Sequence, residues 1–112
     1  MKKGILNLLL LLLVDYCHAA ILKWDGEAGD GQWVTSINWD LDRLPVPGDE
    51  VILDNAYIND DYTVFLPGGN NAVSLLSLII SPGSSQIITC ILPSANTASP
   101  ALILTGPGDV FV

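Results

Sequence analysis

After Asp49, hydrophobic residues gather in short runs that turn residues separate from one another. Branched and aromatic side chains, which are enriched in β-strands, dominate every run. Gly, Pro, Asn and Ser, which favour turns, fill the intervals. We therefore predict an all-β module over residues 50–112. The expected strands are EVILD (50–54), DYTVFL (61–66), AVSLLSLIIS (72–81), SQIITCIL (85–92) and PALILT (100–105).

The alternation of apolar and polar positions narrows the architecture. In DYTVFL, Tyr62, Val64 and Leu66 share one face, as on a strand that covers a core. SLIIS and IITCIL are apolar on both faces, which predicts strands buried on both sides, as in stacked or wrapped sheets. The opening coils of a right-handed parallel β-helix and a small β-sandwich both satisfy this spacing. A helix from Ala72 to Ser81 is a further alternative, which Pro82 would end after about three turns.

Residues 20–49 differ from the rest, because they are rich in Gly, Asp, Asn and Trp and have no sustained helical period. Their three indoles, Trp24, Trp33 and Trp39, can cover a large apolar area. The first coil of a β-solenoid has an apolar end that has to be covered. We therefore predict that residues 20–49 form an N-terminal cap over that coil.

Two polar features are expected to shape this cap. The amide of Asn38, next to Trp39, would satisfy backbone groups of the loop. Pro47, Gly48 and Asp49 form a turn signal that would lead the chain into its first long strand. The site predicted from these residues is structural.

The residues of the cap also carry a resemblance to known proteins. KWDGEAGDGQWVTSINWD…RLPVPGDEVIL, followed by TVFLPGGNNAVSLLSLIISPGSSQI, resembles the N-terminal segment of large secreted bacterial surface proteins with right-handed β-helix passengers. These include autotransporter-type adhesins and repeat-rich secreted proteins of gliding bacteria. The segment is more loosely similar to the G8 type of extracellular β-domain, in which a Trp segment precedes a Pro-Gly-Asp turn. The resemblance covers residues 23–85 and implies a cell-surface or secreted structural module, with no catalytic residue carried over.

The first residues indicate export. Lys2 and Lys3 precede an unbroken apolar run over residues 8–14, which is typical of a secretory signal peptide and too short to span a bilayer. We predict a leader over residues 1–19, cleavage after Ala19, and a secreted or cell-surface location. An alternative makes Cys17 a lipid-bearing residue that attaches the protein to a membrane, as in a small lipid-anchored binding protein. Cleavage after Ala19 leaves Cys90 without a disulfide partner, so it is expected to pack as a small apolar residue.

The charge of the exported chain limits its partners. From residue 20 onward the chain holds two strong bases, Lys23 and Arg43, and eleven of the twelve acids, so its formal charge is 2 − 11 = −9. Such a surface repels phosphate backbones and anionic lipid heads, so no nucleic acid is expected. An extracellular glycan or another surface partner remains, and Tyr57 or Tyr62 could stack on a sugar or pack in the core.

Few kinds of catalysis fit residues 20–112. The segment has no histidine to activate a serine and only one cysteine, so a serine hydrolase and a zinc site are excluded. The cluster of Gly26, Gly29 and Gly31 lacks the strand and helix of a phosphate cradle. Asp60 and Asp61 are adjacent and would point to opposite faces of a strand, unlike a glycosidase pair. We therefore predict a protein that is not an enzyme.

Calcium is the one cofactor that the composition leaves open, because it takes several oxygen ligands in irregular geometry. Structural turns are the favoured role for the carboxylates that could converge on it, which are Asp25, Glu27, Asp30, Asp40 and Asp42.

The C-terminal residues 109–112 read as the start of another strand, so we expect a fragment of a longer protein. Two functions follow. The first is a non-enzymatic, exported structural or adhesive protein. The alternative is the N-terminal part of a polysaccharide-acting β-helix enzyme whose catalytic residues lie beyond Val112.

Overall fold

The computed structural model of the chain describes residues 20–106. The expected leader with Cys17, and the expected strand at 109–112, lie outside these residues. Among residues 20–106, no helix is long and apolar enough to cross a bilayer. The elements are β1 (Ile21–Lys23), η1 (Ser36–Asn38), β2 (Glu50–Asp54), β3 (Tyr62–Phe65), β4 (Val73–Leu75), β5 (Ser77–Ser81), β6 (Ile88–Ile91) and β7 (Leu102–Leu104).

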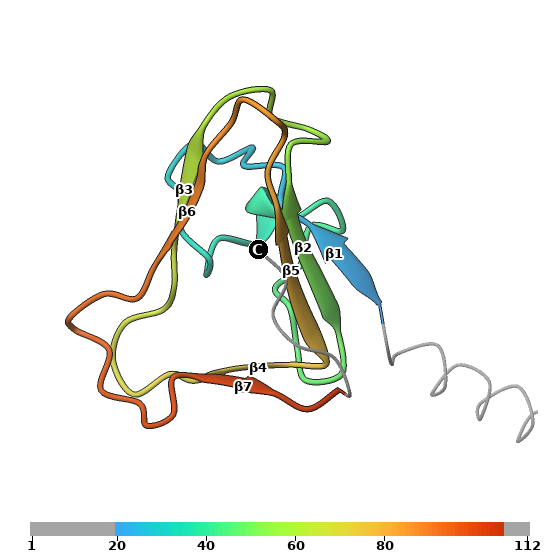
Figure 1. Cartoon of the computed structure of the whole chain (residues 1–112). Coiled ribbons are helices and arrows are strands. Elements are labelled where there is room, and N and C mark those ends of the chain that lie inside the picture. The colour runs from blue at the N-terminus through green and yellow to red at the C-terminus, as the bar shows by residue number, and fades with distance from the viewer. Residues whose placement is uncertain (1–19, 107–112) are drawn as a thin grey trace, which may run out of the picture.

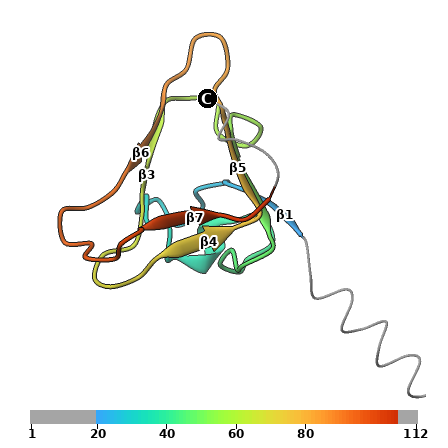
Figure 2. The same cartoon turned by 60° about the horizontal axis from the view of Figure 1, so that its bottom comes forward.

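The strands form parallel sheets that wrap the chain into a β-solenoid of triangular cross-section (Figures 1 and 2). β1, β2 and β5 form one wall, β3 and β6 the second, and β4 and β7 the third. Glu50 of β2 pairs with Ser77 of β5, 27 positions later, which sets the length of one coil. The predicted parallel β-helix is confirmed. The β-sandwich is wrong, because its strands would pair antiparallel, whereas every strand ladder in residues 20–106 is parallel.

The core consists of inward side chains that stack from coil to coil. Leu22, Val51 and Leu78 occupy one register position in the first wall and are all buried. In the second wall Val64 is fully buried, whereas its partner one coil later, Cys90, is half-buried. Cys90 packs against the core as the sequence indicated, and burial raises the pKa of its thiol. The coil formed by β2, β3 and β4 is therefore buried more completely than the coil that follows it.

The longest expected strand, AVSLLSLIIS, is two strands joined by a corner. β4 ends at Leu75 and β5 begins at Ser77. Before the corner the buried residues are Val73 and Leu75, and after it the buried residue is Leu78. The inward positions therefore change there from odd to even numbers. Leu76 forms the corner, and its N–H donates to the carbonyl of Asp49 at 2.8 Å. The helix alternative for this segment is wrong, because its hydrogen bonds run to neighbouring coils.

The prediction that IITCIL is buried on both faces is also wrong. In β6, Thr89 and Ile91 are exposed while Ile88 and Cys90 are half-buried. A solenoid wall has the core on one side and solvent on the other, so alternate residues of β6, here Thr89 and Ile91, face solvent.

Candidate functional site: the N-terminal cap

The three tryptophans of the cap meet in one buried cluster. Trp24, Trp33 and Trp39 are each at most 3% exposed. Trp39 stands edge-on to both others, with ring centroids 5.1 Å from Trp24 and 4.7 Å from Trp33. Such edge-to-face contacts contribute about 0.5–1.5 kcal/mol each beyond the burial of area. Trp24 also stacks on Tyr62 of β3, with centroids 6.3 Å apart, so the cluster packs directly on the first coil.

The cap also adds an incomplete coil to the solenoid. β1 pairs with β2, and residues 31–33 run alongside β3. The Trp33 N–H donates to the Phe65 carbonyl at 2.9 Å, and the Phe65 N–H donates to the Gly31 carbonyl at 2.8 Å. Gly31 has a φ of +68°, and a Cβ there would lie 3.0 Å from the Thr63 carbonyl oxygen. The close pairing with β3 therefore requires glycine at position 31.

Asn38 connects the loop of the cap from its buried position at the end of η1. Its Oδ1 accepts from the Ala28 N–H at 2.9 Å, and its Nδ2 donates to Asp30 Oδ1 at 2.7 Å and to the Gln32 carbonyl at 2.9 Å. Its own carbonyl accepts from the Asp25 N–H. The side chain thus satisfies backbone groups of the loop, the role expected for it.

Asp30 is a second organiser of the loop, and the sequence suggested it only as a calcium ligand. Its Oδ1 accepts from the Gln32 N–H at 3.0 Å, two residues on, and its Oδ2 accepts from the Thr35 hydroxyl at 2.7 Å. The bonds from Gln32, Thr35 and Asn38 lower the pKa of this carboxyl. The Asp-Gly-Gln sequence signals such an Asx turn, and that signal could have identified the residue.

The Pro47–Gly48 turn leads into β2 through Asp49. The Asp49 N–H donates to the Val46 carbonyl at 3.0 Å, and Gly48 has a φ of +95°. A type II turn requires a positive φ at its third position, here Gly48, and commonly has Pro at its second, here Pro47. The Asp49 side chain closes the turn from the other side, because its Oδ2 accepts from the Val46 N–H at 2.9 Å.

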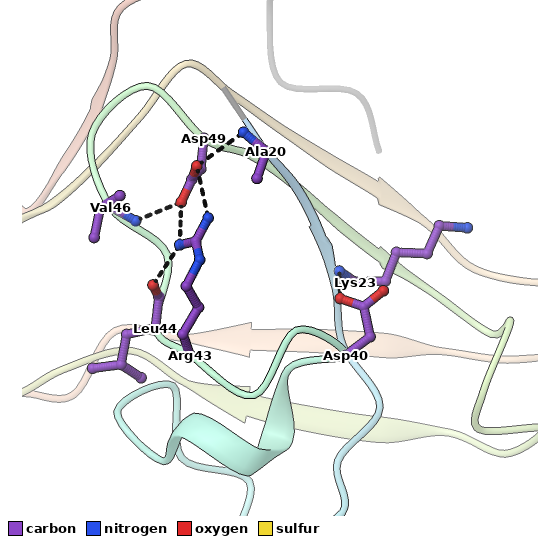
Figure 3. Close-up of polar contacts among 7 residues, drawn as sticks. All are labelled: Ala20, Lys23, Asp40, Arg43, Leu44, Val46 and Asp49. Carbon is purple, nitrogen blue, oxygen red and sulfur yellow. Dashed lines mark hydrogen bonds and ion pairs between the residues drawn. The ribbon is translucent and has the colours of Figure 1, made fainter. Parts of the chain in front are cut away.

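Asp49 also joins the turn to the rest of the cap (Figure 3). Its carboxylate accepts from Arg43 Nη1 at 2.7 Å and Nη2 at 3.2 Å, and from the Ala20 N–H at 3.2 Å. Burial raises the pKa of Asp49, but the hydrogen bonds from Arg43, Val46 and Ala20 outweigh it and hold the pKa below its usual range. The hydrogen bond from Arg43 to Asp49 raises the pKa of Arg43. Sequence reasoning missed Arg43, although it is one of two strong bases in residues 20–112.

The chain around Asp40 covers the outer edge of β1. Asp40 Oδ1 accepts from the Lys23 N–H, and the Asp40 N–H donates to the Lys23 carbonyl, both at 2.9 Å. Trp24 and Trp39 add an antiparallel bridge beside them. An uncovered strand edge would be free to pair with other chains. The cap therefore blocks the first edge of the solenoid as well as its apolar end.

The carboxylates considered for calcium are placed separately. Asp30 is bonded within its loop and Asp40 to β1. Among residues 20–106, no group of three or more acidic, histidine or cysteine side chains could hold a metal ion.

Tyr57, Tyr62 and two depressions are the other surface features to place. Tyr57 is 57% exposed, and its hydroxyl lies 3.4 Å from Asp40 Oδ2, whereas Tyr62 is half-buried against Trp24. A polar depression of about 550 Å³ is lined by Asp60, Asp61, Ser85 and Gln86. A smaller groove of about 200 Å³ between the cap and the first coil is mostly apolar, and its lining includes Trp33, Val34, Leu44, Pro45 and Pro47 of the cap.

Comparison of the chain with family models, curated proteins and solved structures gave no match.

Proposed function

We propose that the chain is a non-enzymatic structural module of an exported protein, secreted or held at the cell surface, with adhesion or display as its role. The observation that carries the proposal is the cap. Its most specific side chains, Trp39, Asn38 and Asp49, are buried and bonded to the chain's own backbone and rings. Such an arrangement stabilises one end of a rigid scaffold and leaves no polar group of these residues aimed at a ligand.

Two further features support this proposal. The leader-like N-terminus and the resemblance of residues 23–85 to bacterial β-helix surface proteins both favour an exported module. Residues 20–112 hold two strong bases and eleven acids, so their formal charge is 2 − 11 = −9. This charge disfavours nucleic acid and anionic lipid as partners and leaves an extracellular glycan or a surface protein. A solenoid suits display, because each coil rests on the coil before it and holds its surface in a fixed position.

The experiment expresses the full chain with its own leader in a secreting bacterium. We expect the protein in the medium or at the surface, where external protease degrades it in intact cells. A matched variant, Leu10→Arg, breaks the apolar run of the leader and should keep the protein inside. Equal amounts of both proteins in the cytoplasm would contradict the proposal.

A catalytic role for the 112 residues themselves, as distinct from an enzyme site beyond Val112, is tested on the same exported protein. The protein is incubated with a panel of plant, algal and bacterial polysaccharides. We expect it to bind one or more of them and to release no reducing ends. Release of reducing ends that Asp60→Asn or Asp61→Asn abolishes would place a glycosidase site in the polar depression and overturn the non-enzymatic role. In the structure, Asp61 accepts from the Ile87 N–H at 2.7 Å, which gives this carboxylate a structural use between coils.

A further inference from the structure

Ala20, the first described residue, is held at both of its backbone polar groups. Its carbonyl accepts from the Glu50 N–H at 2.9 Å, which continues the pairing of β1 with β2. Its nitrogen donates to Asp49 Oδ1 at 3.2 Å (Figure 3). The predicted leader ends at Ala19. The nitrogen that contacts Asp49 is therefore the one that leader cleavage would turn into the α-amino group of the exported chain.

We propose that cleavage between Ala19 and Ala20 creates an ammonium group that forms an ion pair with the buried carboxylate of Asp49. The step is a hydrolysis catalysed by a signal peptidase. Water gives its hydroxyl to the Ala19 carbonyl carbon and a hydrogen to the Ala20 nitrogen. At neutral pH the new amine takes a proton from solvent, and the new Ala19 carboxyl group releases one. The inference rests on the predicted export, and it makes processing a step that completes the cap.

The surroundings of Asp49 suit an added positive charge. The Asp49 side chain is 1% exposed, and its two oxygens already accept from Arg43, Val46 and Ala20. Arg43, with 39% of its side chain exposed, is the charged group that bonds to this carboxylate. The neighbouring Glu50 turns its own carboxylate to the hydroxyl of Ser77 at 3.2 Å. Replacing the neutral Ala20 donor by an ammonium adds charge at a position where a hydrogen bond is already made.

The geometry allows this pair for one cleavage position. Each extra residue before Ala20 can carry the terminal charge up to about 3.3–3.6 Å away along an extended chain. A chain that begins at Ile21 lacks the donor altogether and leaves Asp49 Oδ1 with the longer of its Arg43 contacts, at 3.2 Å. The ion pair is therefore available only to a chain that begins at Ala20.

The pair makes stability depend on pH in a defined direction. A free α-amino group has a pKa of about 7.7–8.0 in an unfolded chain. Pairing with Asp49 raises this pKa in the folded chain, because a nearby carboxylate favours the charged form. The stabilisation is therefore complete below about pH 7.7 and is lost as pH rises through the raised value.

The test uses the full chain exported with its own leader. Intact mass of the exported product is measured first, and a start at Ala20 is expected. Thermal melts from pH 6 to pH 10 then compare this protein with a variant that carries Gly-Ser between Ala19 and Ala20. We expect the Ala20 form to melt about 4 °C higher at pH 6.5, the shift that a modest ion pair gives in a domain of this size. The difference should vanish near pH 10.

A second variant separates the charge from any steric effect of the extension. Asp49→Asn keeps the size of the side chain, and the Ala20 form and the extended form of this variant should melt with the same pH dependence between pH 7 and pH 10. If Asp49→Asn does not fold, an NMR titration of the Ala20 amino group in the unaltered protein replaces it and should show a midpoint above pH 8.0.

Three results would overturn the inference. They are an exported chain that starts at another residue, coincident pH profiles for the Ala20 and extended forms, or a midpoint for the Ala20 amine at or below that of an unfolded chain. The last two leave the proposed surface role standing, because they concern only the contact with Asp49. Retention of the protein inside the cell would defeat the surface role and this inference together.

Discussion

At the scale of single residues, the cap depends on polar side chains that bond to backbone. The sequence identified Asn38, Pro47, Gly48 and Asp49 from their turn chemistry, and the structure places each of them in such contacts or turns. The sequence did not reveal the contact of Ala20 with Asp49, because the two residues lie 29 positions apart. Long-range partners of this kind leave no local pattern in a single sequence.

Asn38→Ala should destabilise the protein. The substitution leaves the Ala28 N–H and the Gln32 carbonyl without their partner. Because both bonds are only partly buried, the cost should lie near the lower end of the about 1–3 kcal/mol that an unpaired buried polar group costs. Urea unfolding followed by tryptophan fluorescence would measure the change. Asn70→Ala, at an exposed position, is the control and should change the unfolding free energy by less than about 0.5 kcal/mol. Equal effects of the two variants would argue against a buried Asn38.

Asp49 should control the acid limb of stability. Its folded pKa lies below its ordinary value because Arg43, Val46 and Ala20 donate to the carboxylate. The contribution is therefore present above the unfolded pKa of about 3.9 and is lost as pH falls through the lower folded value. Melts between pH 2 and pH 7 should show a smaller acid-induced fall in Tm for Asp49→Asn than for the natural protein. An unchanged acid limb would mean that Asp49 is not held as the structure shows.

At the scale of elements, most strands could be predicted and the corner could not. Branched residues bounded by Gly, Pro and Asn located β2, β3, β6 and β7. AVSLLSLIIS has no turn residue at Leu76, so it was predicted as one strand, and only the shift of inward positions from Leu75 to Leu78 marks the bend. The pairing of residues 31–33 with β3 could not be predicted either, because no local pattern in the sequence indicates which segment lies alongside β3.

Gly31→Ala tests the pairing of the cap with β3. Gly31 and Gly29 both have a positive φ, +68° and +71°, so a methyl group strains the backbone at either position. At Gly31 it also meets the Thr63 carbonyl oxygen at 3.0 Å, whereas at Gly29 it meets nothing within 4 Å. Gly29→Ala should cost about 1 kcal/mol, and Gly31→Ala should cost at least that much more, measured by urea unfolding. Equal losses would show that residues 31–33 do not pack on β3.

At the scale of the whole molecule, the cap and the second coil bury the first coil between them. The parallel architecture followed from the resemblance and from the strand spacing, but spacing alone left the β-sandwich open. The coils were not visible as a repeat, because their length varies, with 29 positions from Leu22 to Val51 and 27 from Val51 to Leu78. That column also shares hydrophobic character rather than residue identity.

Leu75→Ala and Leu104→Ala test the order of burial along the solenoid. The two residues are register partners in β4 and β7, with Leu75 fully buried and Leu104 half-buried. Truncating a fully buried leucine costs about 2–5 kcal/mol. The free energy of unfolding should therefore fall more for Leu75→Ala, and at Leu104 the loss should be about half as large or less, in line with the smaller area removed from water. A larger loss at Leu104 would reverse the proposed order.

The central claim is that three indoles lie over the first coil of a parallel solenoid. The most direct measurement is a nuclear Overhauser spectrum of the protein in solution. We expect cross-peaks from the ring of Trp39 to the rings of Trp24 and Trp33, together with backbone contacts that join Leu22 to Val51 and Val51 to Leu78. Indole rings without contacts to one another, or strand contacts of antiparallel hairpins, would contradict the account.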